Sequence, residues 1–78
     1  MIFHPNIGTL YTYAEVSQIL GIRRQSVRAF VHRGSLQAVT YIGKRFGTEG
    51  ELLRYAVRVK GMDTDLLSER LRQVREGQ

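Results

Sequence analysis

A glycine at position 21 constrains the fold of this chain more than any other residue. It stands in the stretch LGIRRQSVRAFVHRG, residues 20–34, between two segments whose apolar residues have helical spacing. Glycine adopts a positive φ without steric cost, so one helix can end at Leu20 and the chain can reverse there. The sequence therefore predicts a helix, a tight turn, and a second helix from about Arg24 to Arg33.

The second helix would have one apolar and one polar face. Val27, Phe30 and Val31 are spaced i, i+3 and i+4, as in a buried stripe. At about 100° per residue the opposite face carries another set: Gln25, Arg28 and His32, with Ala29 beside them. This face contains no acidic residue, and it suits the major groove of DNA, where Gln can read adenine and Arg can read guanine. The alternative is a solvated helix face that binds nothing.

The positive charge of the chain is concentrated in its middle third. The 78 residues have a net charge of +5. Residues 21–47 carry six basic residues and no acidic one, whereas residues 48–78 balance six basic with six acidic residues. A segregated charge of this kind predicts a positive face and a polyanionic partner.

Composition argues against several other classes of protein. With 42% hydrophobic residues the chain can form one modest globular core, and the absence of cysteine excludes disulfides and thiolate metal sites. No apolar run reaches the roughly 20 residues of a membrane span, and no signal peptide is recognisable, so we expect a cytoplasmic protein without membrane contact. No patterned nucleophile, His–carboxylate cluster or phosphate-binding glycine loop is present. We therefore expect no enzymatic activity, cofactor, metal ion or small-molecule ligand.

The segment before the first helix has no helical periodicity. Within residues 1–11, Thr9–Tyr11 could form a short strand or an extended arm against the core. Thr12 and Glu15 then form a T-x-x-E capping box, which opens the first helix. That helix is short and has to be held by packing against the next one.

A small β-hairpin is predicted after the second helix. Two runs rich in β-branched and aromatic residues, Ala38–Ile42 and Arg45–Thr48, are separated by Gly43 and Lys44. Glycine at the first central position is typical of a type II′ turn. This pairing would place Lys44 and Arg45 at or beside the tip of the hairpin.

Two further helices complete the expected architecture. A second T-x-x-E pattern at Thr48 opens a helix that ends near Lys60, and Asp63 or Thr64 caps a last helix that ends near Arg75. The third helix is apolar over more than half of its circumference, and the fourth has its own stripe, formed by Leu67, Leu71 and Val74. The fourth helix therefore either folds back within the chain or pairs with a second copy through residues 52–75.

In this order of elements the chain resembles a winged helix-turn-helix. Residues 11–22 look like the opening of the excisionase and MerR-type DNA-binding domains, in which a Thr-capped helix runs into a Leu-Gly-Val/Ile turn. Residues 23–36 are similar to the recognition helix of that family and its Gly-x-Leu exit. The run of residues 43–46, GKRF, resembles the wing. The resemblance covers residues 10–57 and implies a mainly α fold with a small β-hairpin, here as a domain over residues 1–61 followed by a C-terminal packing or dimerisation helix over 62–78.

The resemblance also implies binding of double-stranded DNA, with the second helix in the major groove and the wing on the backbone or minor groove. The residues expected to contact DNA are Arg23, Arg24, Gln25, Ser26, Arg28, His32, Arg33, Lys44 and Arg45. The chain departs from the family where Arg23 replaces a Ser or Asn cap, where Gln37 replaces a frequent Pro, and where Thr48 and Glu49 replace an apolar-Pro pair.

Three functions fit this pattern. The first is an excisionase-like recombination factor or transcriptional regulator that binds DNA sequence-specifically, as a homodimer or as adjacent copies, and associates with the nucleoid when bound. The second is a phage small terminase-type DNA-packaging subunit, which uses the same chemistry. The third is a protein-interaction adaptor that keeps the fold and does not bind DNA.

Overall fold

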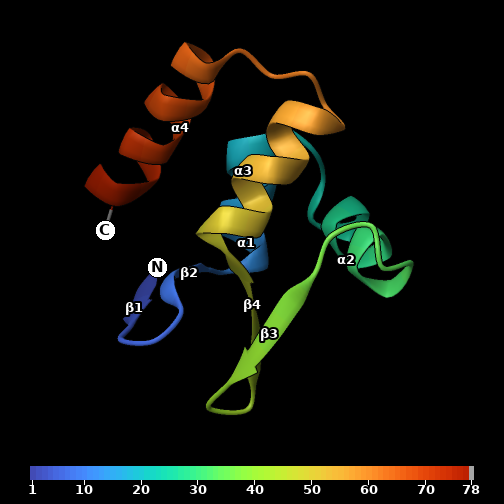
Figure 1. Cartoon of the computed structure of the whole chain (residues 1–78), viewed down its shortest axis with the longest axis vertical. Helices are drawn as coiled ribbons and strands as arrows, with labels where there is room; N and C mark the ends of the chain where they lie inside the picture. Colours follow the sequence, from blue (N-terminus) through green and yellow to red (C-terminus); the bar gives the residue numbers. More distant parts are fainter. Residues whose placement is uncertain (78) are drawn as a thin grey trace.

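Residues 1–77, the part of the chain that the computed structural model describes, form four helices and one four-stranded antiparallel sheet (Figure 1). In chain order the elements are β1 (Ile2–His4), β2 (Gly8–Tyr11), α1 (Tyr13–Leu20), α2 (Arg24–His32), β3 (Ala38–Tyr41), β4 (Lys44–Thr48), α3 (Glu49–Arg58) and α4 (Thr64–Glu76). The fold is thus mixed α/β.

The prediction of a mainly α winged helix-turn-helix with a small β-hairpin is therefore wrong. The expected hairpin supplies only half of the sheet, whose strand order is β1-β2-β4-β3. β1 and β2 form a second hairpin, and β2 pairs with β4 through Leu10–Thr48 and Tyr11–Gly47. This pairing joins residues far apart in the chain, which the local spacing of apolar residues cannot reveal.

The start and end of α1 follow the predicted local chemistry. Thr12 Oγ1 accepts a hydrogen bond from the Glu15 amide at 3.1 Å, and the Glu15 carboxylate accepts one from the Thr12 amide at 2.9 Å. At the other end Gly21 adopts φ 69°, in the left-handed region. The capping box and the glycine turn together fix where α1 begins and where the chain enters α2.

α2 begins without a side-chain cap at Arg23, as its sequence predicts. It ends in a Schellman motif, in which Gly34 takes φ 80° and its amide donates to the carbonyl of Val31. The amide of Ser35 donates to the carbonyl of Phe30. These bonds turn the chain sharply toward β3 and hold Leu36 in the core, where it is 2% exposed.

The register of the β3–β4 hairpin differs from the prediction by one residue. Tyr41 pairs with Lys44, so the two-residue loop is Ile42-Gly43 and not Gly43-Lys44. Both loop residues have positive φ, 51° and 72°, as in a type I′ turn, whose twist matches that of the flanking strands. Gly43 thus occupies the second central position, and Lys44 and Arg45 belong to β4.

α1 lies at the centre of the fold, in contact with α2, α4, β2 and β4. The apolar core is built around it from residues of the helices, β2 and the loop before β3: Tyr11, Val16, Ile19, Leu20, Val27, Leu36, Leu52, Tyr55, Ala56, Leu67 and Val74. In Figure 1 the β3–β4 hairpin points to the bottom of the view, and α2 lies at the right, above the tip of the hairpin.

α4 packs within its own chain, against α1 and α3. It buries Leu67 and Val74, and Leu71 packs partly buried against the core. In this region Val57, Val59 and Leu66 stay exposed. Pairing of two copies through residues 52–75 stays a prediction, which sedimentation at micromolar concentrations tests.

Candidate nucleic-acid interface

The two faces of α2 are separated as the sequence predicts. Val27 is fully buried, whereas Gln25, Arg28 and His32 are exposed on the opposite side. Burial of Val27 against the core fixes the rotation of the helix about its axis. The side chains of Gln25, Arg28 and His32 therefore follow one another along the exposed face of α2, which we call the ridge.

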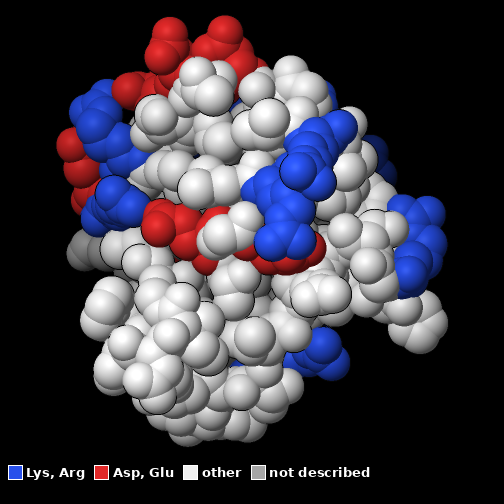
Figure 2. Space-filling model, in the orientation of Figure 1, with Lys and Arg blue, Asp and Glu red and all other residues white. Residues whose placement is uncertain are grey.

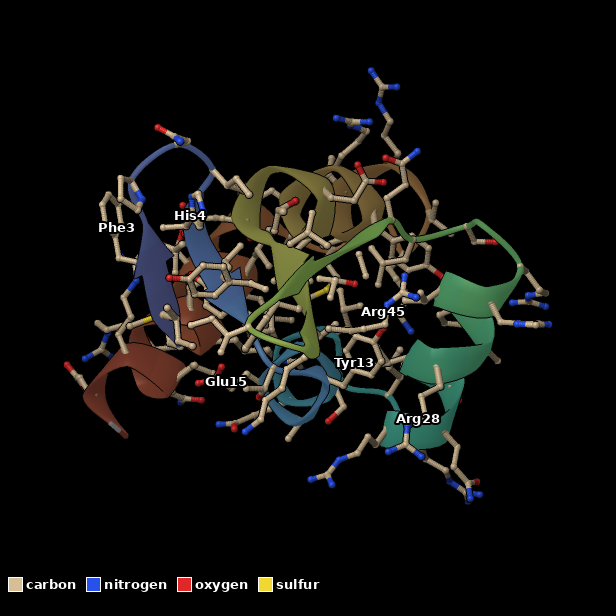
Figure 3. All side chains as sticks on the ribbon, turned by 90° about the horizontal axis from the view of Figure 1, so that it is seen from below. Phe3, His4, Tyr13, Glu15, Arg28 and Arg45 are labelled. Atoms are coloured by element: carbon tan, nitrogen blue, oxygen red, sulfur yellow. The ribbon has the colours of Figure 1, made fainter. Side chains whose placement is uncertain are left out.

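An open hollow of about 380 Å³ lies beside this ridge, where three elements meet. Its lining comes from the start of α1, from α2 and from the first residues of β4: Thr12, Tyr13, Ala14, Arg24, Arg28, Lys44 and Arg45. Seen from below, Tyr13 lies between Arg28 and Arg45 (Figure 3). Two segments separated by the whole of β3 thus bring four cations to one place.

The lining of the hollow has four basic side chains and no acidic one, so its net charge is positive. The ion pairs found among residues 1–77 lie elsewhere: Arg54–Glu51, Arg72–Glu69, Arg72–Glu76, Arg75–Glu49 and the Met1 amino group with Glu15. The four cations of the hollow are therefore available to an anionic ligand.

The acidic side chains gather on another part of the molecule. In Figure 2 they lie over α3 and α4, interspersed with basic ones, while the lower part of this face, over the hairpin, shows basic but no acidic atoms. Glu15, the single acidic residue before position 49, is only 8% exposed and belongs to the capping box of α1. The acidic residues and the excess of basic residues, which occupy different parts of the sequence, thus also lie on different parts of the surface.

The structure does not bring all of the predicted contact residues to the hollow. Ser26 is half-buried in the first turn of α2. Arg33 lies at the far end of that helix, with its guanidinium carbon 4.9 Å from the centre of the Phe30 ring. Arg23, Gln25 and His32 are exposed on or beside α2 but do not line the hollow.

Sequence reasoning missed the contribution of α1 to this site. It assigned Thr12 to the capping box alone, yet Thr12 lines the hollow together with Tyr13 and Ala14. The sequence carried no signal for this contribution, because it depends on how the start of α1 approaches α2 and β4 in the folded chain.

No group of three His, Cys, Asp or Glu residues in the described part of the chain is placed to hold a metal ion. None of the helices over residues 1–77 combines the length and apolarity needed to span a bilayer. No protein family, curated protein or solved structure matches this chain.

Proposed function

We propose that this chain binds double-stranded DNA, with the outward face of α2 in the major groove and the β3–β4 hairpin on the phosphate backbone or minor groove. The observation that carries the proposal is the convergence of Arg24, Arg28, Lys44 and Arg45 on one hollow without acidic residues. A DNA backbone is the polyanion that such a surface suits, because it offers closely spaced phosphates.

The proposed contacts are of two kinds: contacts to the phosphate backbone and contacts to base edges. Arg24, Lys44 and Arg45 would contact phosphates, which supply affinity without regard to sequence. Gln25 and Arg28 lie on the exposed ridge of α2, where their side chains could reach base edges in the major groove. Arg28 belongs to both the ridge and the hollow, so it would set how deeply the helix enters the groove.

Binding of this kind fits a small transcriptional regulator or an excisionase-like recombination factor, with a cytoplasmic location and association with the nucleoid when bound. A DNA-packaging subunit would use the same contacts. An adaptor that binds only proteins would not need an acid-free cationic hollow, so DNA binding is favoured over that alternative.

Salt dependence of binding to a mixed-sequence duplex tests the proposal. If four to six phosphates are neutralised, the slope of log K against log salt should be about −4 to −5, since each contributes roughly −0.9. The double variant Lys44→Ala, Arg45→Ala should make the slope shallower by about two units. The matched control is Arg54→Ala, which removes an exposed arginine paired with Glu51 on α3. A wild-type slope near zero would exclude DNA binding and favour the adaptor.

A further inference from the structure

The tip of the β3–β4 hairpin carries an apolar residue in an unfavourable backbone conformation. Ile42 has φ 51° and is the one non-glycine residue among residues 1–77 with positive φ. A β-branched side chain is disfavoured there because its Cβ lies too close to the backbone. Ile42 is also 79% exposed, more than any other large apolar side chain of the described residues. Neither backbone preference nor burial in its own core accounts for isoleucine at this position.

The residues that follow the tip belong to the cationic hollow. Tyr41 pairs with Lys44 and Thr40 with Arg45, so both basic residues lie within the first two pairs of the hairpin. Their side chains line the hollow together with Arg24 and Arg28 of α2. A phosphate held in the hollow would therefore place the neighbouring groove of the duplex next to Ile42.

We propose that Ile42 is an apolar wedge that enters the minor groove, partly unstacks one base step and bends the duplex. This inference rests on the proposed DNA binding. A two-residue tip is narrow enough for a groove about 6 Å wide, which broader elements cannot enter. Minor-groove proteins insert Ile, Leu or Phe between base pairs in this way, and the bend brings more backbone against the protein. Flexible pyrimidine–purine steps such as TA make the deformation least costly.

Phe3, the next most exposed large apolar side chain of the described residues, lacks this setting. Phe3 is 73% exposed on β1, the strand at the opposite edge of the sheet from β3. In Figure 3 it lies well away from Arg28 and Arg45. An apolar side chain without adjacent cations has no phosphate contacts to hold it against a duplex, so Phe3 serves as the matched control.

The test uses Ile42→Asn, for which the wedge and a structural role predict opposite results. Asn-Gly is the preferred pair in a type I′ turn, so the variant should unfold at a higher temperature than the wild-type protein. Its side chain cannot replace the wedge. Bending is measured by energy transfer between dyes at the two ends of an A/T-rich duplex with central TA steps. The wild-type protein should shorten the end-to-end distance, whereas Ile42→Asn should leave it unchanged and bind about five- to tenfold more weakly.

Two further variants complete the experiment. Ile42→Leu keeps an apolar tip and should retain bending, and Phe3→Asn should bend the duplex as the wild-type protein does. If Ile42→Asn binds and bends the duplex as the wild-type protein does, the wedge is wrong while DNA binding stands. If the wild-type protein binds no duplex even at low salt, the proposed function itself fails.

Discussion

The guanidinium of Arg70 donates a hydrogen bond from Nη1 to the carbonyl oxygen of Ile19 at 3.0 Å. Ile19 lies in the last turn of α1, where carbonyl groups have no partner within the helix. The same guanidinium lies beside Gly21, so close that a Cβ there would meet Nη1 at 2.8 Å. α4 therefore holds the turn that sets the direction of α2, although it is the element most distant from α2 in the sequence.

This contact makes Gly21 more sensitive to substitution than its backbone conformation alone requires. Gly21→Ala and Gly34→Ala each force a side chain into the left-handed region, at a cost of about 1–2 kcal/mol. Only at Gly21 would the new methyl group also displace Arg70, because nothing lies within 4 Å of a Cβ at Gly34. Urea unfolding should show the larger loss for Gly21→Ala. Equal losses would mean that Arg70 moves aside at no cost.

Substitutions on the ridge of α2 and in β4 should have different effects on DNA binding. Gln25→Ala or Arg28→Ala should relax discrimination between related duplexes by about 1–3 kcal/mol at the affected base pair. Lys44→Ala should weaken binding to every duplex by a similar factor and reduce the salt slope by about one unit. Competition binding with duplexes selected from a random pool measures both effects. If Lys44→Ala loses specificity while Arg28→Ala loses only affinity, the hairpin and not α2 recognises the DNA sequence.

The two faces of α2 can be tested with the same charge. Val27 is fully buried, so Val27→Asp should unfold the protein, because an unpaired carboxylate in an apolar core costs several kcal/mol. Ala29 is exposed beside Arg28, so Ala29→Asp should keep the fold and weaken DNA binding by repelling phosphates. Circular dichroism and duplex titration separate the two outcomes. A folded Val27→Asp protein would contradict the assigned rotation of α2.

Tyr11 should make stability fall at alkaline pH. Burial, with the hydrogen bond that its hydroxyl donates to Glu49 Oε1 at 2.9 Å, raises the pKa of Tyr11 above its usual 10.0. The folded state thus holds the phenolic proton more tightly than the unfolded state does. The resulting stability is fully present below pH 10.0 and is lost as pH rises through the folded pKa. Urea unfolding on either side of that range should show a smaller drop for Tyr11→Phe than for the wild-type protein, and equal drops would contradict the assignment.

The features that depend on hydrogen bonds between residues close in the sequence could be predicted from the sequence. The capping box of Thr12 and Glu15 and the turn at Gly21 depend on groups a few residues apart, so their outcome was visible in the sequence. At Thr48 only the threonine half formed: its Oγ1 accepts from the Glu51 amide at 3.4 Å. The Glu51 carboxylate lies 3.2 Å from the Arg54 guanidinium. Arg54 lies three residues after Glu51 in the same helix, so the rotamer of Glu51 decides between this ion pair and the cap, and the T-x-x-E motif does not encode that choice.

The register of the β3–β4 hairpin and the presence of the β1–β2 hairpin could not be predicted from local sequence patterns, for different reasons. Placing glycine first in the loop avoids a strained isoleucine, yet the sheet adopts the register that strains Ile42. The β1 strand has three residues and stops before Pro5, so it has too little pattern to be recognised. The basic residues of the hollow could be predicted because Lys44 and Arg45 stay near the hairpin tip in either register. The position of Tyr13 in the lining could not be predicted, because it depends on how α1 approaches β4.

The pairing of Leu10 with Thr48 has a consequence for the order in which the chain folds. Thr48 ends β4 and caps α3, and its partner strand β2 lies on the other side of α1, α2 and β3 in the sequence. A loop of that length has to close before the pairing contributes anything, and contacts between distant residues slow folding. The β3–β4 hairpin and the α1–α2 turn need no such closure. The hydrogen bonds between β2 and β4 should therefore form after those within the two hairpins, and the amides that donate them should be the last of the sheet to gain protection from hydrogen exchange as the chain folds.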